Sequence, residues 1–247
     1  NSRIISRALS TKKFINRRFR GIVASAAGSG SLADIIFYWG MESGTWSNAE
    51  KAAGSATGTV NGSAAVSSIT VRVGTHSFSG PTVGAYVAFN PVSNFDFTQG
   101  GIGLWYYQAA AFADFGDLFR IQYSGDPNNN MVYCSTTAAG HINWQWIAGG
   151  TGTSFSTTVG TAMTTGNWYW VQLLRNGTVF TLSIYDTGGS LVDSDTQTVT
   201  LGSLAGALDQ MLIGDADGNS NTNFYDNVLV TNSTSRNLQL INTGTSF

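Results

Sequence analysis

The sequence is poor in charge and in helix-forming residues, and this shortage excludes a helical protein. Charged residues make up 11% of the 247 residues, about half the usual share. Glu42 and Glu50 are the only glutamates, although glutamate is among the good helix formers. No run approaches the roughly 18 consecutive apolar residues of a transmembrane helix. A helical bundle and a helical membrane protein are therefore both excluded.

Cysteine is almost absent, so the fold cannot depend on an intrachain disulfide. Cys134 is the only cysteine and ends an apolar run that begins at Met131. A cysteine nucleophile needs a histidine partner, and neither His76 nor His141 lies near Cys134 in the sequence. We expect Cys134 to be a small buried residue.

The residues that are abundant describe an all-β protein. Thirty glycines, together with many Asn, Ser and Thr, separate short runs rich in Val, Ile, Thr and aromatic residues, the pattern of strands joined by turns. We expect strands at 35–39, 69–73, 85–89, 102–107, 118–123, 131–135, 142–147, 168–174, 179–185, 191–200 and 224–230. So many short strands predict a two-sheet antiparallel β-sandwich of the jelly-roll type.

The strongest local signal is a hairpin between residues 168 and 185. Asn176-Gly177 separates two runs rich in β formers, and Asn-Gly is preferred in type I′ turns because both central residues need positive φ.

Basic charge is concentrated at the start of the chain. The first twenty positions hold seven of the twelve basic residues, and the remainder of the chain carries five against fourteen acids. These seven are Arg3, Arg7, Lys12, Lys13, Arg17, Arg18 and Arg20. A small-residue linker follows at residues 24–31. We therefore divide the chain into a basic arm and linker, 1–32, and a sandwich domain, 33–247.

Four roles for the arm remain open. It could bind nucleic acid through counterion release, lie on a membrane surface as an amphipathic helix, serve as a targeting or pro-segment, or anchor the chain in partner subunits. No recognised nucleic-acid fold accompanies it, so specific nucleic acid recognition is not expected. We favour the anchor.

The order of several short motifs resembles the concanavalin A-like, laminin G-like jelly rolls. Met41-Glu42-Ser43-Gly44 follows the first expected strand, and Gly166-Asn167-Trp168 precedes the hairpin. Leu212-Ile213-Gly214-Asp215 and Phe224-Tyr225-Asp226-Asn227 lie near the end. The resemblance covers about residues 34–232. It implies a fold but no single function, because this fold carries many.

The resemblance also implies a structural Ca²⁺. In that family its ligands come from an early glutamate, matched by Glu42, and from an aspartate opening the last strand, matched by Asp226. A second candidate is the run from Asp215 through Asp217 to Asn221, whose alternating side-chain oxygens suit a hard cation. The alternative is an Asx-rich turn without metal.

No glycosidase pattern is present. Such enzymes need a close pair of carboxylates, whereas both glutamates lie in one early loop region and Asp193 and Asp195 are expected on a solvated strand face. There is also no G-x-S-x-G motif. We therefore expect no catalytic residues and no enzyme.

Glycan binding is a stronger hypothesis, with Trp144, Trp146 and His141 as candidate residues. Alternation puts the two tryptophans on one face of their strand and Asn143 and Gln145 on the other. The tryptophans serve as a sugar platform only if they are exposed, and the hydrophobic effect favours their burial.

Two functions follow from this interpretation. The first is a non-enzymatic structural subunit of a virus-like, phage-type particle, such as a head-decoration or tail-appendage protein. It would be oligomeric, anchored to other virion subunits by its arm, and located on the virion surface or outside the cell. The alternative is a carbohydrate-binding module or lectin-like adhesion domain of a microbial surface protein.

Overall fold

The described chain folds into two antiparallel β-sheets. The computed structural model describes residues 35–90, 99–112, 114, 116–149, 155–158, 160–216 and 222–232. Within these ranges there is no helix, and consequently none that is long and apolar enough to cross a membrane. The expected all-β sandwich is confirmed.

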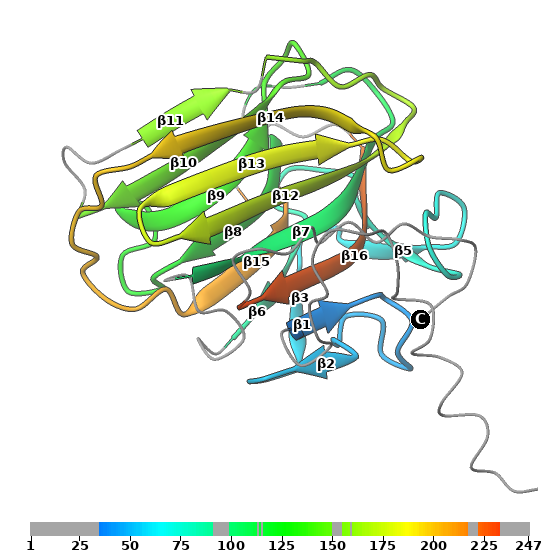
Figure 1. Cartoon of the computed structure of the whole chain (residues 1–247). Helices are drawn as coiled ribbons and strands as arrows, with labels where there is room; N and C mark the ends of the chain where they lie inside the picture. The colour runs from blue at the N-terminus through cyan, green and yellow to red at the C-terminus, as the bar shows by residue number, and fades with distance from the viewer. Residues whose placement is uncertain are drawn as a thin grey trace, which may run out of the picture.

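One sheet has nine strands and follows the order β14-β13-β12-β7-β16-β1-β2, with β5 pairing with β16 and β4 pairing with β5. Figure 1 views this sheet from its outer side. Its strands are β1 (Ile35–Trp39), β2 (Lys51–Ala52), β4 (Ala65–Ser67), β5 (Ser77–Gly80), β7 (Gln99–Gln108), β12 (Trp168–Asn176), β13 (Val179–Tyr185), β14 (Leu191–Thr198) and β16 (Asn223–Thr231).

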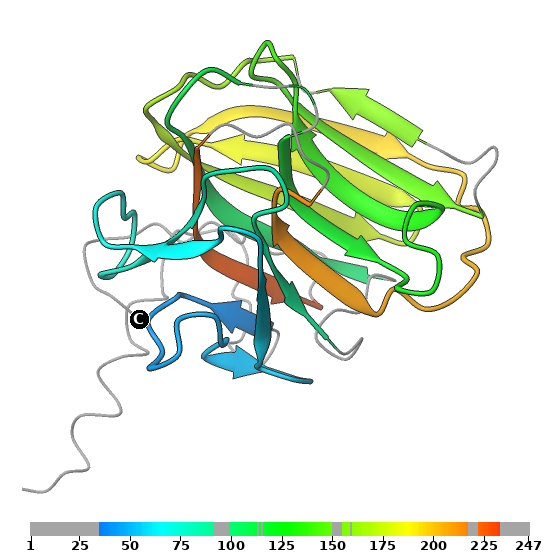
Figure 2. The ribbon, with the colours of Figure 1, turned by 180° about the vertical axis from the view of Figure 1, so that it is seen from behind.

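The second sheet has seven strands in the order β11-β10-β9-β8-β15-β6-β3. It lies behind the first sheet in Figure 1 and faces the viewer in Figure 2. Its strands are β3 (Gly58–Asn61), β6 (Tyr86–Phe89), β8 (Gly116–Gln122), β9 (Asn130–Thr136), β10 (Ile142–Ala148), β11 (Phe155–Thr158) and β15 (Gln210–Gly214).

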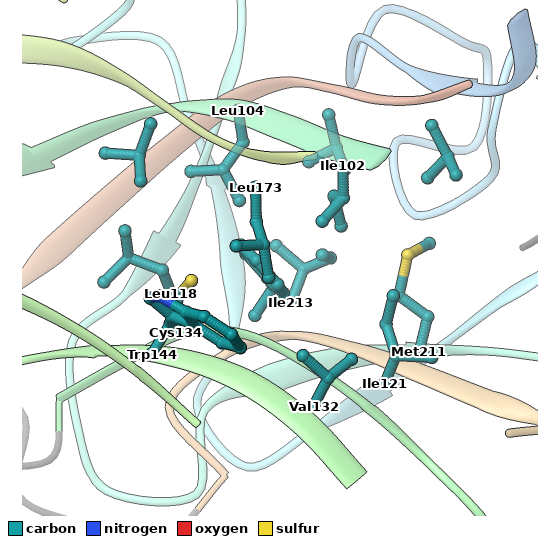
Figure 3. Packing of buried hydrophobic residues seen from close by; sticks show 14 of the residues in the cluster. Ile102, Leu104, Leu118, Ile121, Val132, Cys134, Trp144, Leu173, Met211 and Ile213 are labelled. Atoms are coloured by element: carbon teal, nitrogen blue, oxygen red, sulfur yellow. The ribbon is translucent and has the colours of Figure 1, made fainter. Parts of the chain in front are cut away.

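The core fills the space between the sheets because every second side chain of a strand points inward. Ile102, Leu104 and Leu173 of the nine-stranded sheet face Trp144 and Cys134 of the seven-stranded sheet (Figure 3). Cys134 is fully buried, as the sequence predicts. Burial raises the pKa of its thiol, and the charge of Asp117 adds to the rise.

One expected strand is wrong. Residues 69–73 form a loop, because the amides of Arg72 and Val73 donate to the Asp226 carboxylate rather than to a neighbouring strand. The loop covers part of the outer side of the nine-stranded sheet. Val73 belongs there to a second apolar cluster with Trp105 and Trp170, and the Arg72 guanidinium lies 4.5 Å from the Trp105 ring centre.

The hairpin between β12 and β13 is confirmed, but its turn is shifted by one residue. Asn176 pairs with Val179, so Gly177 and Thr178 are the central residues of the turn. Gly177 has φ of 62°, whereas Asn176 and Thr178 do not have positive φ. A single positive φ at the first central position is the pattern of a type II′ turn.

Candidate functional site

The outer side of the seven-stranded sheet carries a row of polar side chains across its central strands. Arg120 of β8 is in register with Tyr133 of β9, and Tyr133 is in register with Gln145 of β10. Their strand neighbours Ile121, Cys134 and Trp144 belong to the core, so alternation directs the row away from it. We call the surface formed by Asp117, Arg120, Gln122, Tyr133, Gln145 and Gln210 the polar face.

An ion pair lies at the centre of the polar face. Arg120 Nη2 is 2.8 Å from Asp117 Oδ2, with side-chain exposures of 5% and 1%. The guanidinium also lies 5.6 Å from the centre of the Tyr133 ring. Burying an ion pair costs more than it returns unless its geometry is good. A recessed pair on an outward-facing sheet surface is therefore a candidate for function rather than for stability.

Amide side chains flank the ion pair. Gln122 Nε2 donates to Gln210 Oε1 at 2.7 Å, joining β8 to β15, and Gln145 on β10 is half-buried. Amides both donate and accept hydrogen bonds. The polar face therefore combines a charge-balanced pair, an aromatic ring and several amides, which is the chemistry that recognises hydroxyl groups.

Trp144 and Trp146 lie in the core, as the hydrophobic effect favoured, and therefore do not form the exposed platform that glycan binding would need. Their exposures are 0% and 2%, and Trp144 stacks on Phe180 of the opposite sheet with ring centres 4.8 Å apart. The hydrophobic effect thus places both indoles inside. His141 lies in the turn before β10 and is half-buried. Desolvation alone would raise the pKa of Asp193, but hydrogen bonds from Thr161 and Ser194, and to a smaller degree the charge of His141, lower it.

A second aromatic row lies on the other sheet. Tyr107 of β7 is in register with Trp168 of β12 and with Phe224 of β16. The ring centres of Tyr107 and Trp168 are 5.3 Å apart, and those of Tyr107 and Phe224 are 5.9 Å apart. All three rings are half-buried. This row lacks the amides and the ion pair of the polar face.

The predicted calcium ligands Glu42 and Asp226 both accept hydrogen bonds from backbone amides of the loop at residues 72–76. Glu42 Oε1 accepts hydrogen bonds from the amides of Thr75 and His76 at 2.7 and 2.8 Å. Burial alone would raise the pKa of Glu42, but these bonds and one from the Thr75 hydroxyl lower it. Asp226 Oδ2 accepts from the amides of Arg72 and Val73, both at 2.9 Å.

Asp226 offers an oxygen that a cation would satisfy. The residue is fully buried, and among the described residues its Oδ1 meets no hydrogen-bond donor. Burial raises the pKa of Asp226 well above its usual value, amide hydrogen bonds oppose the rise, and the negative charge of Glu42 adds to it. Two carboxylates fit part of a calcium ligand set. However, the described chain contains no group of three or more ligating side chains close enough for a metal.

Glu50 and Tyr38 belong to the same region and were missed from the sequence. Glu50 accepts hydrogen bonds from the amides of Gly40 at 2.6 Å and Glu42 at 2.8 Å. Burial raises the pKa of the Tyr38 phenol, and the charges of Glu50, Asp226 and Glu42 raise it further. The only sequence signal was that Glu50 is the second of two glutamates, which does not reveal its partners.

The other predicted metal ligands do not join this cluster. Asp215 is fully buried, and its charge acts on the phenols of Tyr106 and Tyr225 rather than on Tyr38. Asp217 lies outside the described residues, as do all seven basic residues of the arm.

Comparison with known proteins supports the β-sandwich fold but identifies no family for the chain. No protein-family model matches the chain, and no curated protein matches its sequence. The structure is similar to the binding domain of botulinum neurotoxin serotype D, with a TM-score of 0.62 at 13% identity. That match covers 84% of this chain, but the chain spans only 50% of the neurotoxin domain.

Two further structural matches are a domain of an arabinanase and a sialidase. Domain 4 of AbnA, an extracellular arabinanase from Geobacillus stearothermophilus solved with arabinotriose, has a TM-score of 0.57 at 12% identity. This match covers 84% of the present chain and 97% of that domain. Trypanosoma rangeli sialidase has a TM-score of 0.54 at 11% identity, with 85% of this chain and 32% of the sialidase covered. The chain therefore shares its β-sandwich fold with parts of these structures.

Proposed function

We propose that this protein is a carbohydrate-binding module and that the polar face holds the glycan. The observation that carries the proposal is the recessed Asp117–Arg120 pair between an aromatic ring and amide side chains. Sugars need planar polar groups for their hydroxyls, and the half-buried amides of Gln145 and Gln210 supply them here. The shared fold with a domain solved with arabinotriose supports the same conclusion.

The test is a glycan array followed by calorimetric titration of each hit. Gln145→Ala removes a half-buried amide of the polar face and should weaken binding about tenfold, the usual effect of losing a hydrogen bond to a ligand. Gln197→Ala is the matched control, because Gln197 is a half-buried glutamine of the nine-stranded sheet. An array without hits would refute the proposal, and equal loss in both variants would refute the assignment to the polar face.

A supporting Ca²⁺ between Glu42 and Asp226 is part of the proposal. The ion would supply positive charge to two carboxylates and satisfy the orphaned Asp226 Oδ1. Its role would be to stabilise the loop at residues 72–76, whose amides donate hydrogen bonds to both carboxylates.

The particle-subunit hypothesis rests on the arm, so it remains a prediction. A glycan-binding role does not require it, although a module on the surface of a particle would suit both. We therefore place the protein outside the cell or on a particle surface as part of the same proposal. No catalytic step is assigned, since the sialidase match covers only a third of that enzyme.

A further inference from the structure

The polar face has a balanced charge although the described chain is strongly acidic. The described residues contain four basic side chains against eleven acids, a formal charge of −7 with the histidines neutral. At the polar face itself, the only charges are those of Asp117 and Arg120, which neutralise each other at 2.8 Å.

Every arginine of the described chain is already engaged within the protein. Arg72 lies over Trp105 and donates to the carbonyl of Thr187. Arg175 lies 4.8 Å from the Trp146 ring centre, and its Nε donates to the carbonyl of Gly177 at 2.8 Å. Arg120 is paired with Asp117.

The remaining basic side chains do not bring positive charge to the polar face either. Lys51 is exposed on β2 of the other sheet. His76 Nδ1 lies 3.6 Å from Glu42 Oε2, and His141 lies in the turn before β10, beyond Asn143 and Gln145 on that strand. A glycan carboxylate placed at the polar face would thus find no uncommitted cation among the described residues, and it would lie near the buried Asp117 carboxylate.

We infer that the ligand is a neutral glycan and that sialylated or uronate-bearing glycans are rejected. This inference rests on the proposed function and specifies its ligand class. Hydroxyl groups donate and accept hydrogen bonds, as do the half-buried amides of Gln145 and Gln210. A carboxylate would lose its hydration without gaining a counter-charge.

The experiment is a glycan array of matched pairs, each a neutral oligosaccharide and its sialylated form, such as lactose and sialyllactose. We expect every pair that binds to favour the neutral member by about tenfold or more, a difference of about 1.4 kcal/mol. Sialylated members that bind equally or more tightly would overturn this inference and leave the proposed function standing. If no glycan of either kind binds, the proposed function and this inference both fail.

A gain-of-charge variant tests the cause of the discrimination. Gln145→Arg places an unpaired guanidinium on the polar face, next in register to Tyr133, and should raise the affinity for sialylated members about tenfold at low salt. Gln197→Arg on the other sheet is the matched control and should leave the preference unchanged. Unchanged discrimination in a folded Gln145→Arg protein, verified by circular dichroism, would overturn the charge argument.

Discussion

At the scale of single residues, two buried carboxylates have very different surroundings. Asp117 has a guanidinium at 2.8 Å, whereas Asp226 has only backbone amides on one oxygen and no donor from the described chain on the other. A buried carboxylate that lacks a counter-charge is costly. The proposed ligand recognition therefore involves Asp117, and the proposed cation site involves Asp226.

The first residue-scale prediction concerns that cation. If Glu42 and Asp226 hold Ca²⁺, removing it with EDTA should lower the melting temperature by about 5 °C, because a ligand bound only by the folded state stabilises it. Asp226→Ala should abolish this sensitivity, and Asp193→Ala should keep it. A melting curve that responds to neither EDTA nor added Ca²⁺ would exclude the site.

The second prediction concerns Trp144. Since this indole is fully buried against Phe180, Trp144→Ala should lower the free energy of unfolding by about 3–5 kcal/mol. Trp168→Ala is the control, because Trp168 is half-buried on the outer side of its sheet and should cost less than about half as much. Urea denaturation measures both, and similar losses would contradict the core position of Trp144.

The ion pair shows why the polar face could not be predicted from the sequence. Residues three apart in a regular strand point to opposite faces, so Asp117 and Arg120 were not expected to meet. A register shift between Asp117 and Phe119 inserts one extra residue and brings both side chains to one face. By contrast, the burial of Trp144 and Trp146 followed from alternation together with the hydrophobic effect.

At the scale of elements, the sequence predicted strands correctly where long β-rich runs exist. It failed where hydrogen-bond partners that are distant in the sequence decide the local structure. The run at residues 168–185 was confirmed as a hairpin. The short strands β2, β3, β4, β5, β11 and β15 were missed because two to five residues carry little periodic signal. The run at 69–73 has strand composition, but its amides bond to Asp226, and composition cannot reveal a partner 154 residues away.

The element-scale prediction concerns the turn of that hairpin. Gly177 adopts φ of 62°, which is unfavourable for a residue with Cβ, so Gly177→Ala should destabilise the protein by about 1 kcal/mol or more. Gly44→Ala is the control. Gly44 does not have positive φ, and a Cβ added there would meet nothing within 4 Å. Equal stability of the two variants in thermal unfolding would contradict the type II′ assignment.

At the scale of the whole molecule, the two sheets present different outer surfaces. The nine-stranded sheet carries a second apolar cluster around Trp105 and Trp170, partly covered by the loop at residues 69–76. The seven-stranded sheet carries the polar face. A sandwich needs only its inner faces for stability, and the proposed binding role falls to the side that carries the recessed Asp117–Arg120 pair.

Backbone-amide NMR shifts on addition of a neutral glycan from the array locate the binding surface. Binding at the polar face predicts the largest shifts at residues 120–122, 133 and 143–145, with small shifts on the other sheet. Shifts concentrated on Tyr107, Trp168 and Phe224 would contradict it, because they would place the ligand on the opposite side of the sandwich.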